Sequence, residues 1–202
     1  MHSNKELIVI DFDETLYKND SLIEFCKFVF KKKPLQSWAV LVQVYASILH
    51  LFKLIDTKRY KELFLYFLYG INEQEVEKLA KEFWENTDIE HFHTKITALF
   101  NRKECRIICI SASPEMFLKP IADVYQFELI GTLLSYHHPK YLIQGENCKG
   151  VEKVKRLKKY LNTEELSISE SYSDSLSDKP LFEHSKNGYI INASGDLQPF
   201  IS

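Results

Sequence analysis

The sequence predicts an α/β protein with a doubly wound, mainly parallel, Rossmann-like sheet and a helical cap inserted near its start. Two short, largely apolar runs, residues 7–10 (LIVI) and 106–110 (RIICI), lead directly to the polar residues Asp11 and Ser111. Such runs are typical of strands that are covered on both faces. Residues 21–100 between them have helical periods and no convincing strand. Beyond them, strand-like and helix-like segments alternate, as in other parallel sheets.

The position of the helical block predicts how the chain is divided. We expect residues 1–17 and 101–202 to form the α/β core and residues 18–100 to form the cap, in which 60–68 (YKELFLYFL) and 73–84 (EQEVEKLAKEFW) have the clearest helical periods. A chain of 202 residues is long enough for one well-packed core that carries such an insert.

The second half of the chain carries the remaining elements of the sheet. Ser113, Pro114 and Glu115 predict a helix start, with an N-cap, a proline at the first helical position and an acidic first turn. Further strands are expected at 127–134, 166–172 and 189–191, and further helices at 151–161 and from Pro180.

One apolar segment of the cap, residues 38–52, follows the basic run 31–33 (KKK). It is shorter than the ~20 apolar residues that span a bilayer, and Gln43 and His50 interrupt it. We therefore expect a buried helix or a cap helix in preference to a membrane contact.

Charge and cysteine content restrict the partners and the compartment. The 26 basic and 28 acidic residues nearly cancel, so nothing favours nucleic acid as a partner. The four cysteines have neither disulfide-framework nor metal-finger spacing, and the N-terminus does not resemble a signal peptide. Reduced thiols and a cytoplasmic location are expected.

The segment from Asp11 to Thr15 (DFDET) carries the first candidate chemistry. Hydrolysis of a phosphate monoester needs a nucleophile, a proton donor for the leaving oxygen and cations for the phosphoryl oxygens. Residues two apart in an extended chain share a face, so the carboxylates of Asp11 and Asp13 can converge where the first strand ends. A lone DxD is a weak signal, but an apolar strand directly before it strengthens the hypothesis.

Two further segments predict a phosphate cradle. The hydroxyl of Ser111 and the amides that lead into the next helix, including that of Ala112, can bind phosphoryl oxygens. Lys149 and Lys153 are four apart, which would put them on one helical face with at least one ammonium near the phosphate. Taken singly, Ser111 reads as a turn residue and the lysines as the solvent side of a basic helix.

A third segment, Asp174 to Asp178 (DSLSD), lies at an expected junction between a strand and a helix. Carboxylates at such a junction suit a hard, oxygen-seeking cation such as Mg²⁺. As a capping motif alone it would be unremarkable.

Together, DFDET, SASP at 111–114 and DSLSD, with a lysine before the last, resemble the motifs of the haloacid dehalogenase superfamily. The resemblance extends from about residue 7 to the last strand. It is closest to the phosphoserine phosphatase-like branch, whose helical cap is inserted between the first two motifs. Residues 147–150 (NCKG) and 131–132 (GT) also resemble that branch.

The resemblance implies a Mg²⁺-dependent reaction through an aspartyl phosphate. It assigns Asp11 as nucleophile and metal ligand, Asp13 as general acid and base whose backbone carbonyl also binds the metal, and Asp174 as the second metal carboxylate. Asp178 would order metal-bound water or the lysine. The phosphate-binding set would be Thr15, Ser111, Ala112 and either Lys149 or Lys153, because members of the family differ in where they place this lysine.

The chain departs from the family pattern at two places. Ser173 stands where many relatives have glycine, and in the cap Asp20 and Arg59 are only loose candidates for reading a phosphoserine head group. We expect a phosphatase for a small phosphorylated metabolite. A phosphotransferase, a lipid-phosphate phosphatase at a membrane surface and a non-catalytic binding protein stay as alternatives, and the oligomeric state is open.

Overall fold

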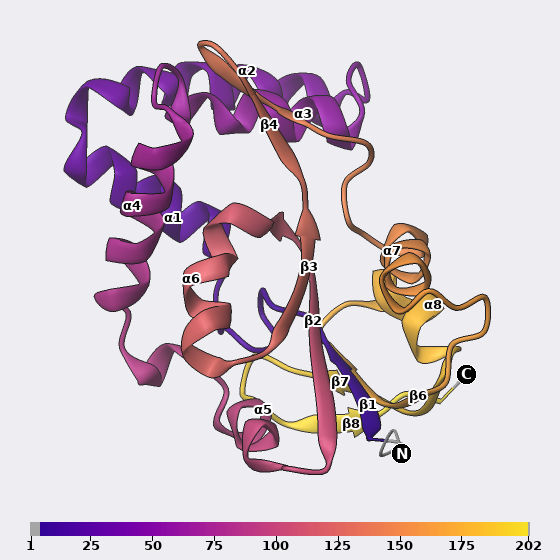
Figure 1. Ribbon diagram of the computed structural model, residues 1–202. Helices are drawn as coiled ribbons and strands as arrows, with labels where there is room; N and C mark the ends of the chain where they lie inside the picture. The colour runs from indigo at the N-terminus through magenta and orange to yellow at the C-terminus, as the bar shows by residue number, and fades with distance from the viewer. Residues whose placement is uncertain (1–4, 202) are drawn as a thin grey trace.

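A six-stranded sheet forms the centre of the protein, which is described here by a computed structural model covering residues 5–201 (Figure 1). Its strands are β1 (Glu6–Ile10), β2 (Cys105–Pro114), β3 (Glu128–Thr132), β6 (Ile168–Ser173), β7 (Ser185–Ile191) and β8 (Leu197–Pro199). They lie in the order β3-β2-β1-β6-β7-β8, and all are parallel to their neighbours except β8, which is antiparallel to β7. The predicted α/β fold with a mainly parallel sheet is confirmed.

Helices cover both faces of the sheet. Those between β1 and β2 are α1 (Ser21–Lys32), α2 (Ala39–Leu51), α3 (Thr57–Phe64), α4 (Glu73–Glu85) and α5 (Thr94–Thr97); later come α6 (Glu115–Tyr125), α7 (Val151–Leu161) and α8 (Lys179–Phe182). Short 3₁₀ turns are η1 (Pro34–Trp38), η2 (Leu65–Leu68), η3 (Ile89–His91), η4 (Ala98–Asn101) and η5 (Leu176–Asp178). Because side chains alternate along a strand, Ile8 and Ile10 pack with α1, α4 and α6, whereas Val9 packs with α7 and α8.

Three of the helices between β1 and β2 are capped at their N-termini by Asp or Asn side chains. Asp20, Asp56 and Asn72 precede α1, α3 and α4, and each side chain accepts a hydrogen bond from the backbone N–H three residues later. Each cap satisfies an N–H group that has no partner within the helix, and is worth about 1 kcal/mol.

One apolar cluster joins these helices to the sheet. Trp84 of α4 packs edge-on against Phe12, with ring centroids 5.5 Å apart, and its indole N–H donates to the carbonyl of Phe117 at 2.6 Å. Phe25 of α1 contacts the ring of Phe117, with centroids 4.8 Å apart. The boundaries of the cap at residues 18 and 100 therefore stay a prediction, because packing is continuous across them.

The expected helix start at Ser113 is wrong. Strand β2 continues to Pro114, which pairs with Thr132 and is itself the extended N-cap residue of α6, without a side-chain cap. The hydroxyl of Ser113 donates to Asp13 at 2.5 Å. It therefore makes a contact between distant segments and is not the helix cap that the local sequence predicts.

The strand expected at 127–134 is also wrong in extent. The main sheet receives β3, and the chain then enters a separate antiparallel hairpin, β4 (Leu134–His137) and β5 (Lys140–Ile143). The sequence pattern predicts neither β5 nor β8. Both are three or four residues long, which is too short for a clear periodic signal.

Residues 38–52 contain the last residue of η1 and the whole of α2, and of the two expected forms, a buried helix or a cap helix, the buried one is wrong. Within α2 only Ala39 and Ala46 are buried, and most of its large apolar side chains are exposed. Among residues 5–201, no helix combines the length and the apolar character needed to cross a bilayer.

Candidate active site

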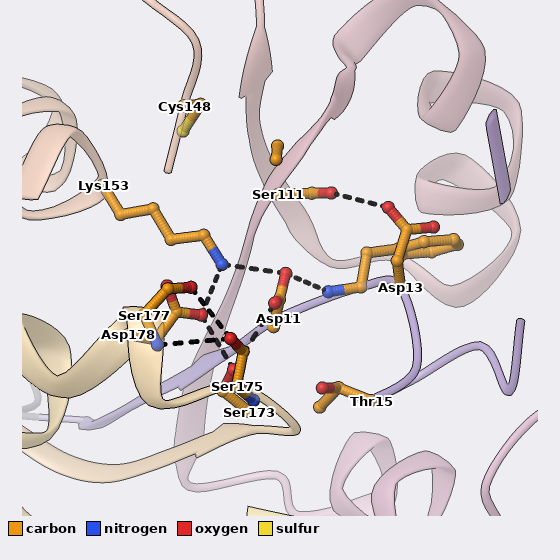
Figure 2. A network of polar contacts seen from close by, with 12 residues as sticks. Asp11, Asp13, Thr15, Ser111, Cys148, Lys153, Ser173, Ser175, Ser177 and Asp178 are labelled. Atoms are coloured by element: carbon orange, nitrogen blue, oxygen red, sulfur yellow. Dashed lines mark hydrogen bonds and ion pairs between the residues drawn. The ribbon is translucent and has the colours of Figure 1, made fainter. Parts of the chain in front are cut away.

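The predicted polar residues meet at one edge of the sheet. Asp11 follows β1, Ser111 lies near the end of β2, and Asp174 follows β6. These three strands are parallel neighbours, so their carboxyl ends face the same crevice, as is usual for ligand sites in such folds. Figure 2 shows Asp11 between Lys153 on one side and Asp13 with Ser111 on the other.

Asp11 is the centre of the site. Its Oδ1 accepts a hydrogen bond from the N–H of Phe12 at 2.7 Å and lies 2.9 Å from Nζ of Lys153. Burial raises the pKa of Asp11, the charge of Lys153 opposes this rise, and the nearby Asp178 adds to it. The contacts therefore favour an ionised carboxylate in a place where burial disfavours one.

Lys153 is the lysine that contacts Asp11. It extends from α7, is 2% exposed, and its Nζ also lies 2.6 Å from Oδ2 of Asp178 (Figure 2). Burial disfavours its charge, but Asp11 and Asp178 outweigh this and hold its pKa above the usual value. The expectation that Lys149 and Lys153 share a helical face is wrong, because α7 begins at Val151 and Lys149 is an exposed residue before it.

Asp13 lies on the opposite side of Asp11, and donors surround its carboxylate. Oδ1 accepts from the N–H of Ser21 at 2.7 Å, and Oδ2 accepts from the hydroxyl of Ser113 at 2.5 Å. Burial raises the pKa of Asp13 and the charge of Asp20 adds to it, while the bonds from Ser113 and Ser21 lower it. A raised pKa favours the protonated form of this carboxyl group, which is the form that a general acid needs.

The turn at the end of β2 contains two of the expected phosphate-binding residues. Ser111 is fully buried; its Oγ accepts from the N–H of Ser113 at 3.0 Å and is 3.5 Å from Oδ2 of Asp13. The carbonyl of Ala112 accepts from Lys61 at 2.5 Å and from Thr132 at 2.7 Å. These bonds fix the turn beside Asp13.

Thr15, which the resemblance assigns to phosphate, contacts Asp174 in this structure. Its hydroxyl accepts from the N–H of Asp174 at 2.9 Å and is 3.2 Å from Oδ1 of the same residue. Glu14, which has a positive φ of 57°, lies near enough that burial and the charge of Asp174 raise its pKa. Thr15 therefore holds Asp174 next to the first motif.

Asp178 and Ser173 complete the far side of the site. The hydroxyl of Ser173 donates to Oδ2 of Asp178 at 2.8 Å and lies 3.5 Å from Oδ2 of Asp11. Asp178 is 1% exposed, and its Oδ1 is a buried oxygen with no hydrogen-bond partner among the described residues. Such an atom suits an ordered water or an ion. The serine that departs from the family pattern thus bridges two aspartates.

The donor set fits a hard cation. Asp11 and Asp174 supply two carboxylates, and the buried Oδ1 of Asp178 has no hydrogen-bond partner among the described residues. Within residues 5–201, no three His, Cys, Asp or Glu side chains are spaced as a metal site of their own. A cation here would need the expected mixture of two carboxylates with a backbone carbonyl.

A cavity of about 270 Å³ opens next to Asp13. Its other lining residues come from the start of α1, from α3, from the turn after β2 and from the loop before α7: Asp20, Leu22, Ile23, Thr57, Tyr60, Lys61, Phe64, Ala112, Ser113, Asn147 and Lys149. A larger groove of about 890 Å³ lies between α4 and α6, but its lining contains none of the catalytic candidates. The smaller cavity is therefore the candidate substrate pocket. Arg59, which pairs with Glu62, is not among its lining residues.

Lys61 is the clearest functional candidate that the sequence did not indicate. It extends from α3 into the pocket, and its Nζ donates to Ala112 O and, at 3.0 Å, to Oδ1 of Asn147. Burial lowers its pKa to about 8, although Asp13 and Asp20 oppose this. Ser113 is a second missed residue, and in both cases the contact joins segments at least 50 residues apart.

Comparison with known proteins agrees with this geometry. The family model of the haloacid dehalogenase-like hydrolases matches residues 8–183, which include all the motifs above. The chain belongs to this family.

Solved structures show the same fold for this haloacid dehalogenase-like hydrolase. A protein of unknown function from Bordetella pertussis Tohama I is 20% identical, with a TM-score of 0.74 over 91% of this chain and 88% of that one. A phosphoserine phosphohydrolase-like protein from Francisella tularensis is 18% identical, with a TM-score of 0.59 over 93% and 87%. A substrate-bound phosphoserine phosphatase is 16% identical, with a TM-score of 0.56 over 92% and 85%. The resemblance to the phosphoserine phosphatase-like branch is confirmed for the fold of this hydrolase.

Proposed function

We propose that this hydrolase is a Mg²⁺-dependent phosphatase that cleaves a phosphomonoester through a phosphoryl group on Asp11. The observation that carries the proposal is the arrangement around Asp11. A buried carboxylate lies 2.9 Å from the ammonium of Lys153, which favours its ionised form, and a second carboxyl group, Asp13, borders the substrate pocket. A buried nucleophile beside a proton carrier that borders a cavity is what a two-step phosphoryl transfer requires.

The two steps assign separate work to the two aspartates. In the first, an oxygen of Asp11 attacks phosphorus, the ester P–O bond breaks, and Asp13 gives its proton to the leaving oxygen. In the second, Asp13 takes a proton from water, which attacks phosphorus and releases inorganic phosphate from Asp11. Burial raises the pKa of Asp13, which supports its role as the acid of the first step.

Other residues would hold the phosphoryl group and its counter-charge. Lys153 and the hydroxyl of Ser111 are the candidate phosphate ligands, and Asp11, Asp174 and the Asp13 carbonyl are the candidate Mg²⁺ ligands. The cation would neutralise charge on the phosphoryl oxygens and on the carboxylates themselves. Thr15 is a positioning residue for Asp174 in this proposal, since its hydroxyl bonds to that residue.

The test compares wild type with Asp11→Asn and Asp13→Asn on an aryl phosphate with Mg²⁺. We expect Asp11→Asn to lose turnover by up to about a millionfold and Asp13→Asn to lose about a hundred- to ten-thousandfold. Acid-quenched wild type should carry phosphate on Asp11, and beryllofluoride should bind wild type but not Asp11→Asn.

The exposed Asp123, which pairs with Lys119 on α6, offers a matched control. Asp123→Asn should keep wild-type turnover. Substantial activity in Asp11→Asn, or trapped phosphate on another residue, would rule out the covalent mechanism.

A further inference from the structure

The outer surface of α2 carries a continuous row of exposed apolar side chains. We call it the α2 face: Val40, Leu41, Val44, Tyr45, Ile48 and Leu51, all of which are exposed. The spacing of three to four residues puts them on one side of the helix, and Leu41 and Leu51 are 76% and 78% exposed. In Figure 1, α2 lies along the edge of the molecule farthest from the central sheet. Contiguous apolar surface of this kind marks an interaction site.

Two polar side chains of α2, those of Gln43 and His50, point the other way. Gln43 donates to the carbonyl of Phe64 at 3.0 Å, and His50 stacks on Tyr60 with ring centroids 4.8 Å apart. A surface helix of a water-soluble protein normally turns its apolar side inward and its polar side to solvent. The order in α2 is reversed, so its outer surface suits an apolar environment.

The charged residues in and around α2 indicate which apolar environment its outer face contacts. Residues 31–55 contain four lysines, at 31–33 and 53, and no aspartate or glutamate. Lys32 and Lys33 form ion pairs with α4, while Lys31 and Lys53 are exposed near opposite ends of the segment. An anionic lipid surface complements both ends.

We propose that the α2 face docks on an anionic lipid bilayer, so that the active site draws its phosphomonoester from that surface. With 13 residues, α2 is too short to span a bilayer and would lie in the interface. The inference deepens the proposed function and rests on it only for the source of the substrate.

The substrate pocket is lined in part by the helix on which α2 packs. Helix α3, which packs against α2, provides Thr57, Tyr60, Lys61 and Phe64 to its wall. A cavity of about 270 Å³ is small for a whole metabolite and suits a phosphate with a few attached atoms. The rest of a lipid would extend beyond it, and the apolar rings of Tyr60 and Phe64 suit the part next to the phosphate.

Vesicle sedimentation tests the docking. The full chain is mixed with vesicles of phosphatidylcholine, with or without phosphatidylglycerol, at low and high salt. Wild type should pellet with anionic vesicles and much less with neutral ones, and high salt should weaken binding. Leu41→Gln/Ile48→Gln/Leu51→Gln should weaken binding by at least about tenfold, because three apolar groups no longer enter the interface.

Ile89→Gln/Val124→Gln is the matched control, since both residues are exposed apolar side chains at the groove between α4 and α6. This variant should bind vesicles as wild type does. Equal binding by wild type and the α2 variant, or no pelleting of wild type, would overturn the docking. So would a wild-type dimer that the α2 substitutions dissociate, because the face would then serve a second copy.

Two substrates separate this inference from the proposed function. All variants should hydrolyse a soluble aryl phosphate equally, whereas phosphatidic acid in anionic vesicles should be hydrolysed at least about tenfold more slowly by the α2 variant. Aryl phosphate turnover without vesicle binding would refute only the docking. Vesicle binding without any phosphatase activity would refute only the proposed function. If the α2 variant hydrolysed phosphatidic acid as fast as wild type does, the inference that the substrate comes from the bilayer surface would be refuted.

Discussion

Replacing Lys153 with methionine tests the electrostatic centre of the site most directly. Nζ of Lys153 lies 2.9 Å from Asp11 and 2.6 Å from Asp178. At an effective dielectric constant of about 20, each attraction is worth about 6 kcal/mol before desolvation. Desolvation of the lysine and of both carboxylates offsets most of this, and removal of one partner of a buried ion pair usually costs about 3–5 kcal/mol, which is the net loss expected here. A domain of ordinary stability, about 5–15 kcal/mol, would lose a large fraction of it.

Urea denaturation measures this loss, and its pH dependence gives a second check. Without Lys153, whose charge lowers it, the pKa of Asp11 should rise further in the folded state. A group with a raised folded pKa destabilises the protein as it ionises, so the loss should be larger at pH 8 than at pH 5. Adding Asp178→Asn to the variant removes one unpaired charge and should recover part of the stability.

The exposed Lys149 provides the control. Lys149→Met should change stability by no more than about 0.5 kcal/mol, whereas Lys153→Met should lower turnover by about a hundredfold or more. A larger loss of turnover in Lys149→Met, or an unchanged free energy of unfolding in Lys153→Met, would refute this account of the site.

Three further outcomes are expected. Turnover of an aryl phosphate should stop when EDTA is added. Mg²⁺ should raise the melting temperature of wild type and raise that of Asp174→Asn much less. Equal shifts in the two proteins would show that Asp174 is not a metal ligand. In a profile of kcat/KM against pH, the wild-type value should fall above pH 8 because Lys61 loses its proton. Lys61→Arg, which keeps its charge, should retain its value at pH 9. The same alkaline fall in Lys61→Arg would show that Lys61 does not cause it. Gly131→Ala would place Cβ 2.9 Å from backbone atoms of Ser113 and Glu115. Urea denaturation should therefore show a free energy of unfolding that is lower by about 1–3 kcal/mol. Stability equal to that of wild type would contradict this contact.

The sequence predicts the aspartates of the site well because local pattern determines their places. Asp11 and Asp174 follow strands directly, and parallel strands bring their ends together whatever the loops do. The choice between Lys149 and Lys153 depended on where α7 begins. Gly150, with φ 58° and ψ −126°, breaks the helical path between them, and this glycine was the signal available in the sequence.

Other features could not be read from sequence because they depend on packing between distant segments. The place of Lys61 follows from how α3 lies over the turn after β2, and that of Ser113 follows from the loop after β1. The sequence does not show which side of α2 faces outward, because its periodicity is the same whichever side faces the protein. The contacts of Gln43 and His50 with α3 identify the inner side.

The aromatic contacts between α4, α1 and the sheet make the inserted helices part of one folding unit with the core. Removing residues 18–100 would leave Phe12 and Phe117, which are almost wholly buried, facing water. The insert is therefore not a detachable module. The protein should melt in a single calorimetric transition, and a shortened chain without the insert should aggregate instead of refolding as a smaller enzyme.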